Sequence, residues 1–296
     1  MSNNVNGEHL PLERRPLGKT GETLSMIGMG GIVVMGMEQP KANAIIAEAI
    51  DRGVNYFDVA PSYGDGEAEE KLGPGLAGKR DGVFLACKTG RRDKQGAAEE
   101  LERSLKRLRT DHFDLYQMHG LTSVDEVRQA LGPGGAIETF LSAREKGQVR
   151  FLGFSAHSAD AAILAMNSFP FDTILFPFNW VCWSQGNFGP QVMDVAREKG
   201  VGLLALKAMA HTNWKEGAER NYSKCWYQPV SDPILGARAL RFTLSLPITA
   251  AIPPGEESLF RLALDTAKSF KPMTSGEMEG LLSEAKGVEP IFRSAA

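Results

Sequence analysis

Four polar side chains stand at or just beyond the ends of three short apolar segments, and their types suit proton transfer. Asp58 and Tyr63 come from NYFDVAPSYG, Lys88 ends GVFLACK, and His119 ends FDLYQMH. If these segments are parallel strands of one barrel, the four side chains converge at its C-terminal end. The positive charge of Lys88 would favour phenolate and lower the pKa of Tyr63. This combination predicts reduction of a carbonyl or oxidation of an alcohol.

Each residue also has an ordinary structural explanation. Asp58 could cap the turn that follows it, Lys88 could be a solvated lysine at a strand end, and His119 could be a turn residue before Gly120. Because independent coincidences would all have to fall at the same end of one barrel, we favour the catalytic interpretation.

The segments that would position these side chains alternate regularly with helical stretches. Apolar strands that alternate with amphipathic helices indicate a parallel sheet covered by helices. Eight such units in 296 residues favour a (β/α)8 TIM barrel over an open doubly wound sheet. The eight predicted strands are 24–30, 54–60, 82–88, 113–119, 149–155, 171–178, 201–208 and 248–253.

Nothing in the sequence divides the chain into separate domains. We find no internal repeat, low-complexity tract or linker, so we predict a flexible arm over residues 1–12 and one domain over 13–296. An extra C-terminal helix is predicted at 275–287, beyond the eighth unit.

Composition narrows the class of protein. The net charge of −3 and the pI near 6.0 argue against nucleic acid or an anionic membrane as the partner. No run of 18 apolar residues predicts a membrane span, and the polar N-terminus lacks the apolar core of a secretion signal. Cys87, Cys182 and Cys225 are widely spaced and form no metal-binding motif, so we predict no metal and a reducing, cytoplasmic location.

Several segments resemble the aldo-keto reductase family. NYFDVAPSYGDGEAEEKLG is similar to its Asp–Tyr signature, and ACKTG and YQMHG supply Lys and His in the third and fourth strands. RRPLGKTGETLSMIGMGG resembles the opening hairpin and first strand, GQVRFLGFSAHS the fifth strand, and AAIPPG the eighth-strand loop. The similarity extends over roughly residues 13–290.

The resemblance implies a barrel that binds a nicotinamide dinucleotide without a Rossmann fold. Accordingly, IGMGGIV is not a dinucleotide fingerprint, because Val33 stands where G-x-G-x-x-G needs its third glycine. The catalytic residues would be Tyr63 as proton donor, Lys88 to tune it, Asp58 to hold Lys88, and His119 to orient the substrate carbonyl. The hydride would come from the cofactor.

Further cofactor contacts are implied by the same resemblance. They are Gly30, Gly31, Asp58, Ser155, Asn179, Lys207, Met209, Gly255, Ser258, Arg261 and Asp265. The segment LKAMAHTNW departs from the family because it lacks the usual glycine and serine of the pyrophosphate loop, for which Lys207 could compensate as a cation or be an ordinary lysine. Leu206 occupies the position at which some members of the family stack an aromatic ring on the nicotinamide. This stacking contact would therefore be missing here unless Trp180 or Trp214 supplies it.

The eighth unit bears on cofactor choice. A helix predicted to start near Glu256 or Glu257 would favour an anion, but two carboxylates disfavour a 2′-phosphate. Arg261 and Ser258 could offset them, so we predict NADP, with NAD as the rival.

Three functions compete at this stage. The first is an NAD(P)H-dependent reductase of a small aldehyde or ketone. The second is a redox-sensing regulatory subunit of the same fold with little turnover, and the third is a metal-dependent isomerase or aldolase. The sequence leaves the substrate, the reaction direction and the oligomeric state open.

Overall fold

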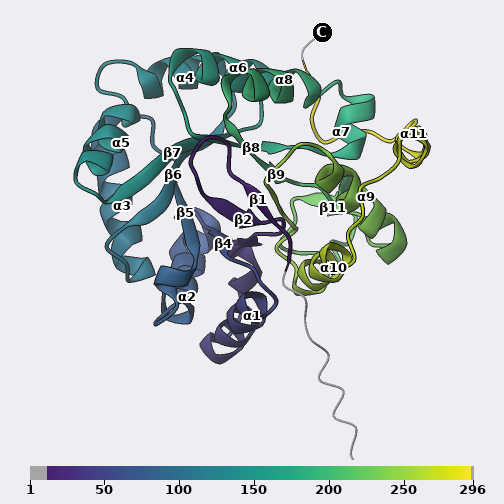
Figure 1. Ribbon diagram of the computed structural model, residues 1–296, viewed down its shortest axis with the longest axis horizontal. Helices are drawn as coiled ribbons and strands as arrows, with labels where there is room; N and C mark the ends of the chain where they lie inside the picture. Colours follow the sequence, from purple (N-terminus) through teal and green to yellow (C-terminus); the bar gives the residue numbers. More distant parts are fainter. Residues whose placement is uncertain (1–11, 295–296) are drawn as a thin grey trace, which may run out of the picture.

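Eight parallel strands form a barrel in the computed structural model, which describes residues 12–294 (Figure 1). Neighbouring strands follow one another in chain order around the ring. A bridge between Ile27 and Ala251, with the amide of Gly28 donating to the Ala251 carbonyl at 3.0 Å, joins the last strand to the first. The predicted TIM barrel is therefore confirmed. The strands are β3 (Met29–Gly30), β4 (Tyr56–Asp58), β5 (Phe84–Thr89), β6 (Phe113–Leu121), β7 (Val149–Ala156), β8 (Thr173–Pro177), β9 (Gly202–Leu206) and β12 (Ala250–Ile252).

Helices surround the barrel, and local sequence signals set several of their ends. The Asp93 side chain caps α3 (Lys94–Leu108) by accepting from the Gly96 amide, and Thr274 and Glu277 form a capping box at the start of α11 (Ser275–Glu284). Gly200, in a left-handed conformation, ends α8 (Pro190–Lys199). The helices are α1 (Gln39–Asp51), α2 (Glu67–Gly75), α3 (Lys94–Leu108), α4 (Val124–Leu131), α5 (Ala136–Glu145), α6 (Ala159–Ser168), α7 (Trp180–Gln185), α8 (Pro190–Lys199), α9 (Pro233–Ser245), α10 (Glu257–Lys268) and α11 (Ser275–Glu284), with short 3-10 turns η1 (Gly31–Val34), η2 (Tyr63–Gly66) and η3 (Arg80–Gly82).

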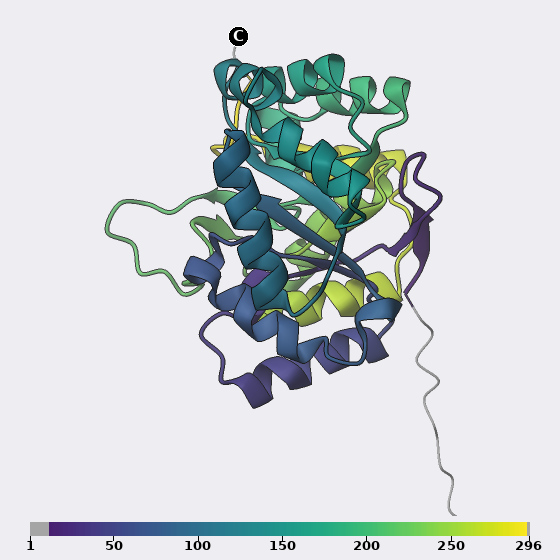
Figure 2. The ribbon, with the colours of Figure 1, turned by 90° about the vertical axis from the view of Figure 1, so that its left-hand side faces the viewer.

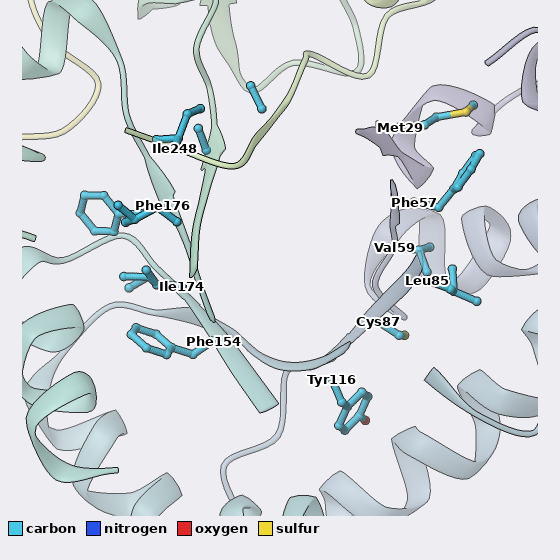
Figure 3. Close-up of a cluster of buried hydrophobic side chains, with 14 of the residues drawn as sticks. Met29, Phe57, Val59, Leu85, Cys87, Tyr116, Phe154, Ile174, Phe176 and Ile248 are labelled. Atoms are coloured by element: carbon cyan, nitrogen blue, oxygen red, sulfur yellow. The ribbon is translucent and has the colours of Figure 1, made fainter. Parts of the chain in front are cut away.

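Side chains alternate between the two faces of each strand. Outward-facing residues such as Phe57, Leu85 and Phe154 pack toward the helices (Figure 3). Inward-facing residues such as Tyr56, Phe84 and Leu115 fill the barrel interior. Because the strand period is two, polar residues in register with the inward set also face inward. This register is what brings the candidate catalytic residues into one space.

An antiparallel hairpin of β1 (Arg14–Pro16) and β2 (Thr23–Ser25) covers one end of the barrel (Figures 1 and 2). The predicted strand 24–30 is therefore wrong in its first half. The apolar run is continuous, but the Ser25 hydroxyl donates to the Ile27 carbonyl at 2.7 Å, and β2 pairs with β1 before the chain enters the barrel. Most of the predicted arm, residues 1–11, lies outside the described residues, and Leu12 is buried in the core.

A second hairpin, absent from the sequence prediction, lies at the opposite end. It pairs β10 (Ala210–Asn213) with β11 (Tyr227–Pro229), and the green loop between them projects away from the purple N-terminal hairpin in Figure 2. Across the described range 12–294, no helix combines the length and apolar character needed to cross a bilayer.

Candidate active site

The side chains of Asp58, Lys88 and Tyr63 meet inside the C-terminal end of the barrel. Asp58 ends β4, and Lys88 lies on β5 in register with the inward-facing Phe84 and Ala86. The Lys88 ammonium forms an ion pair with Asp58 Oδ1 and donates to Tyr63 Oη at 3.3 Å. It also donates to the Val59 carbonyl at 3.2 Å, so all three of its donor positions are used.

A tight turn delivers Tyr63 to this point. The Tyr63 amide donates to the Ala60 carbonyl at 3.1 Å, and the next three residues, 64–66, have positive φ angles. Gly64 and Gly66 take these angles without the steric cost of a Cβ, and a Cβ on Gly66 would also lie 2.0 Å from the Arg107 guanidinium. The Gly-Asp-Gly sequence after Tyr63 is therefore needed to turn the chain back into α2.

Asp58 has two further partners that sequence reasoning missed. Its Oδ2 accepts from Gln117 Nε2 at 2.9 Å and from the Tyr56 hydroxyl at 3.3 Å. Both donors could have been predicted from the sequence. Tyr56 lies two residues before Asp58, and Gln117 two residues before His119, so strand periodicity places each on the same face as its catalytic neighbour. With both oxygens hydrogen-bonded, the carboxylate is fixed toward Lys88.

Burial and charge act in opposite directions on Lys88 and Tyr63. Burial disfavours the ammonium, but Asp58 and Tyr63 outweigh it and raise the pKa of Lys88. Burial also dominates at the phenol, and although Lys88 acts to lower it, the pKa of Tyr63 is raised overall. Lys88 thus acts in the predicted direction, but the prediction that the pKa of Tyr63 is lowered is wrong. Removing the phenolate from water destabilises it more than the Lys88 ammonium stabilises it.

His119 lies beside Tyr63 as a neutral imidazole. Its ring meets the Tyr63 ring edge-on, with centroids 5.6 Å apart, and its Nδ1 lies 3.4 Å from the Ser62 hydroxyl. Burial first, and then the charge of Lys88, hold the pKa of His119 well below its usual value. A neutral ring carries one N–H donor and one acceptor at neutral pH.

A cavity of about 300 Å³ opens beside these groups. The four predicted catalytic residues line it, and so do three further predicted cofactor contacts: Ser155, Lys207 and Gly255. Its other lining residues include Ile32, His157, Leu206, Lys224, Trp226 and Pro254. Of the four tryptophans, Trp226 lies in this lining, whereas Trp180 is buried and stacks on His211. Neither Trp180 nor Trp214 is among the lining residues.

Two predicted cofactor residues lie behind the cavity wall. Asn179 caps α7: its Oδ1 accepts from the amides of Val181 and Cys182, and its Nδ2 donates to the carbonyls of Lys207 and Ala210. Met209 is fully buried. Their cofactor roles stay predictions, and a contact from Asn179 would require it to give up one of these hydrogen bonds.

The predicted 2′-phosphate residues lie around α10, whose start at Glu257 agrees with the sequence prediction. Arg261 donates to Glu48 at 2.8 Å and to Glu257 at 2.6 Å, while Asp265 pairs with Arg52. Ser258 is exposed in the first turn. The predicted cation is therefore already engaged by two carboxylates.

The three glycines predicted as cofactor contacts have a packing reason of their own, and of these Gly255 lines the cavity. A Cβ on Gly31 would lie 2.7 Å from Val59 Cγ2, and one on Gly255 would lie 2.2 Å from Ile32 Cγ2. At Gly30 the nearest atom, Ile252 Cγ2, would be 3.0 Å away. Close approach to a cofactor stays a prediction for Gly30 and Gly31.

Sequence reasoning also missed the contacts of Lys224, which lines the cavity. Lys224, in the loop between β10 and β11, donates from its ammonium to the Val33 carbonyl and from its amide to Glu256 Oε1, both at 2.8 Å. The loop 214–226 shows no strand or helix periodicity, so this contact could not be predicted from the sequence.

Comparison with known proteins decides the family. The aldo/keto reductase family model matches residues 26–250. The chain belongs to the aldo/keto reductase family.

Individual relatives of this aldo/keto reductase extend along most of its length. The chain is 27% identical over 304 aligned positions to "Uncharacterized oxidoreductase YqkF" of Bacillus subtilis, covering 93% of this chain and 97% of that protein. It is 28% identical to "Aldo-keto reductase yakc [NADP(+)]" of Schizosaccharomyces pombe over 64% of this chain and 59% of that one. The holo form of aldo-keto reductase AKR11C1 from Bacillus halodurans has the same fold, with a TM-score of 0.73, 23% identity and coverage of 95% and 98%. A general oxidoreductase role follows from this membership.

Proposed function

We propose that this protein reduces an aldehyde or ketone to an alcohol with a reduced nicotinamide dinucleotide, and that Tyr63 donates the proton. The observation that carries the proposal is the Lys88 ammonium, which contacts both Asp58 and the Tyr63 hydroxyl at the wall of the cavity. An ion-paired lysine directed at a phenol has no evident structural purpose there, but it suits acid–base catalysis.

Tyr63 stays protonated through the neutral range because burial raises its pKa. It can therefore donate to a substrate oxygen on which negative charge develops. The phenolate that remains would be stabilised by the Lys88 ammonium 3.3 Å away. Lys88 in turn keeps its charge because Asp58 raises its pKa against burial.

His119 would orient the substrate carbonyl. If the Ser62 hydroxyl donates to Nδ1, the imidazole proton lies on Nε2, and that N–H can donate to the same oxygen as Tyr63. Two donors from β6 and from the turn after β4 then fix the carbonyl oxygen, which positions the carbon for attack.

The residues present fit a nicotinamide dinucleotide, which would supply the hydride when bound. The cavity extends from Tyr63 to Pro254 and Gly255, directly before α10. Glu256 makes no side-chain cap at the start of this 12-residue helix, so its first-turn amides are available to a phosphate. We propose Ser155, Gly255 and the first turn of α10 as cofactor contacts.

We infer NADP as the preferred cofactor, with NAD as the rival. The charges around α10 are nearly balanced: Lys41, Arg52 and Arg261 face Glu48, Glu257 and Asp265. A 2′-phosphate can draw Arg261 and Lys41 from Glu257 because it carries more charge than one carboxylate. The name of the S. pombe relative, which includes NADP(+), supports this choice. The three unpaired thiols support a cytoplasmic location.

The test is titration with NADPH and NADH by fluorescence, followed by turnover with a panel of aldehydes and ketones. We expect micromolar binding and carbonyl-dependent oxidation of the bound cofactor. Tight binding without turnover across the panel would instead identify a regulatory subunit. The absence of binding by either dinucleotide would contradict both functions.

A further inference from the structure

Lys207 follows β9 and presents an unused ammonium to the cavity. Its Nζ lies 5.0 Å from the Trp226 ring centroid and 5.2 Å from that of Tyr227. Within residues 12–294, this ammonium has neither a carboxylate partner nor a hydrogen-bond acceptor, so its three N–H donors are free. Two aromatic faces hold the cation in place without neutralising it.

The other two cavity lysines are engaged. Lys88 is paired with Asp58, and the Lys224 ammonium donates to the Val33 carbonyl at 2.8 Å. Asp58 is the single carboxylate among the residues that line the cavity in the described part of the chain. The lining thus carries more positive than negative charge. Of its three lysines, Lys207 is the one whose ammonium has no hydrogen-bonding or ion-pair partner in the described part of the protein.

The backbone at Lys207 is held in an uncommon conformation. Its φ angle is 63°, in the left-handed region that side chains other than Gly, Asn and Asp rarely adopt. The Lys207 carbonyl accepts from Asn179 Nδ2 at 3.0 Å and from the Ala210 amide at 2.9 Å. Such strain at a cavity wall, kept by specific hydrogen bonds, is a common feature of functional positions.

The charge of Lys207 also acts on the two histidines that line the cavity. After burial, its charge is the cause that lowers the pKa of His157, and it contributes to lowering that of His119. Trp226, which Lys207 contacts, packs against Phe292 from the C-terminal segment, and Phe292 stacks on His157 at 5.0 Å. Lys207, Trp226 and His157 therefore line the same cavity as Tyr63 and His119, the groups proposed to bind the substrate oxygen.

We propose that Lys207 forms an anion subsite that selects carbonyl substrates bearing a carboxylate or a phosphate. The inference rests on the proposed function, since it names the substrate class of that same site. The reacting carbonyl would contact Tyr63 and His119 while the anionic end of the substrate contacts the Lys207 ammonium. In a partly enclosed site the cation is poorly solvated, so its attraction for an anion is stronger than at the protein surface.

The first experiment compares matched substrates in the complete enzyme. Succinic semialdehyde is paired with butanal, and glyceraldehyde 3-phosphate with glyceraldehyde, so that the two possible anions are tested separately. The variants are Lys207→Met, which removes the charge, and Lys207→Arg, which keeps it. Lys146→Met controls for net charge, because Lys146 is exposed and precedes β7 at the opposite end of the barrel.

We expect wild type to prefer the anionic member of at least one pair. Lys207→Met should lower kcat/KM for that substrate by about 10- to 100-fold, mainly through KM, as for a lost hydrogen bond to a charged group. The neutral partner should change less than about threefold, Lys207→Arg should restore part of the preference, and Lys146→Met should leave it unaltered. Equal losses on charged and neutral substrates, with weaker NADPH and NADH binding, would show that Lys207 binds the cofactor pyrophosphate and would overturn the subsite.

A second measurement does not depend on turnover. Calorimetric titration with succinate and with inorganic phosphate, in the presence of oxidised cofactor, should detect binding that Lys207→Met abolishes and Lys146→Met retains. If no carbonyl is reduced but this binding is present, the proposed reaction fails and the anion subsite stands. If carbonyls are reduced but neither anion binds and no substrate pair is discriminated, the subsite fails and the reaction stands.

Discussion

At the scale of single residues, the Lys88 ammonium organises the site. It contacts Asp58, Tyr63 and the Val59 carbonyl, and it is fully buried. A charge removed from water in this way needs a partner on every donor. Each of its neighbours therefore has a separate role: Asp58 keeps it charged, Val59 orients it, and Tyr63 receives the effect of its field.

Tyr63→Phe tests the proton donor directly. The substitution keeps the ring and its packing against His119 but removes the hydroxyl. We expect kcat for carbonyl reduction to fall by roughly 100-fold or more, the range for general acid catalysis, while NADPH affinity changes little. Steady-state kinetics with a fluorescence titration of cofactor measure both. Turnover close to wild type would remove Tyr63 from the mechanism.

Lys88→Met tests the tuning charge. Without the ammonium, burial and the charge of Asp58 still act to raise the pKa of Tyr63 and nothing opposes them, so this already raised pKa should rise further. Alcohol oxidation, which needs Tyr63 as a base, should then require a higher pH than in wild type, and its rate should be low. Because Asp58 is left buried and unpaired, stability should also fall, by roughly 3–5 kcal/mol. The measurement is the pH profile of alcohol oxidation, on variant protein shown by circular dichroism to be folded. A profile that does not shift would contradict the proposed effect of Lys88 on Tyr63.

The preference for anionic substrates should depend on pH. Burial lowers the pKa of Lys207 to about 8, although Cys225 and Cys182 oppose this and Lys88 adds to it. Lys207 is therefore charged below pH 8 and loses its charge above it, while His157 and His119 nearby are neutral throughout. The ratio of kcat/KM for succinic semialdehyde to that for butanal should decline as pH rises through about 8. A ratio that stays constant from pH 6 to 10 would argue against Lys207.

At the scale of elements, we propose that the start of α10 determines which dinucleotide binds. Arg261 projects from this helix to Glu48 on α1 and to Glu257 one turn back, and Lys41 on α1 also reaches Glu257. The cations that could bind a 2′-phosphate are therefore in place but engaged. On this proposal, the choice of cofactor would depend on whether a 2′-phosphate can compete with Glu48 and Glu257 for the Arg261 guanidinium.

Arg261→Ala measures this competition. If the guanidinium binds the 2′-phosphate, NADPH should lose on the order of 1.5–3 kcal/mol of binding free energy, and NADH much less. Glu257→Gln should have the opposite effect and favour NADPH, because it frees Arg261 and Lys41. Arg238→Ala is a matched control, since Arg238 makes a similar two-bond contact with Glu284 between α9 and α11. Equal losses for both cofactors, or wild-type preference for NADH, would identify an NAD-dependent enzyme.

The elements differ in how well the sequence predicts them. The eight barrel strands are predictable because each is an apolar run followed by a turn, and inward-facing Asp58, Lys88 and His119 follow from strand period and end position. The loop 214–226 is not predictable, because its contacts, such as that of Lys224 with Val33, come from residues distant in sequence. For the same reason the sequence does not show that Asn179 is occupied as a helix cap, or that Arg261 already has partners.

At the scale of the whole molecule, the N-terminal hairpin and the candidate active site lie at opposite ends of the barrel. The hairpin of β1 and β2 closes the N-terminal end (Figure 2), where the Thr249 hydroxyl donates to the Pro16 carbonyl at 2.8 Å. The candidate site lies at the C-terminal ends of the strands. The loop 214–226 and the C-terminal segment through Phe292 gather at the site end. Substitutions near the hairpin should therefore change stability more than substrate choice.

Cofactor binding should stabilise the whole barrel, because the cavity joins strands from both halves of the chain. A ligand that binds only the folded state at about 100 times its Kd adds about 2.7 kcal/mol to the free energy of unfolding. For a domain of this size that corresponds to a Tm increase of roughly 5 °C. We expect NADPH to produce this shift at a lower concentration than NADH, in a thermal denaturation series over both cofactors. Tyr63→Phe should keep the full shift, because the proposed role of its hydroxyl is in proton transfer and not in cofactor binding, whereas Arg261→Ala should lose much of the shift for NADPH alone. If neither dinucleotide moves Tm at saturating concentration, the cavity beside Lys88 does not bind this cofactor, and the proposed reaction fails with it.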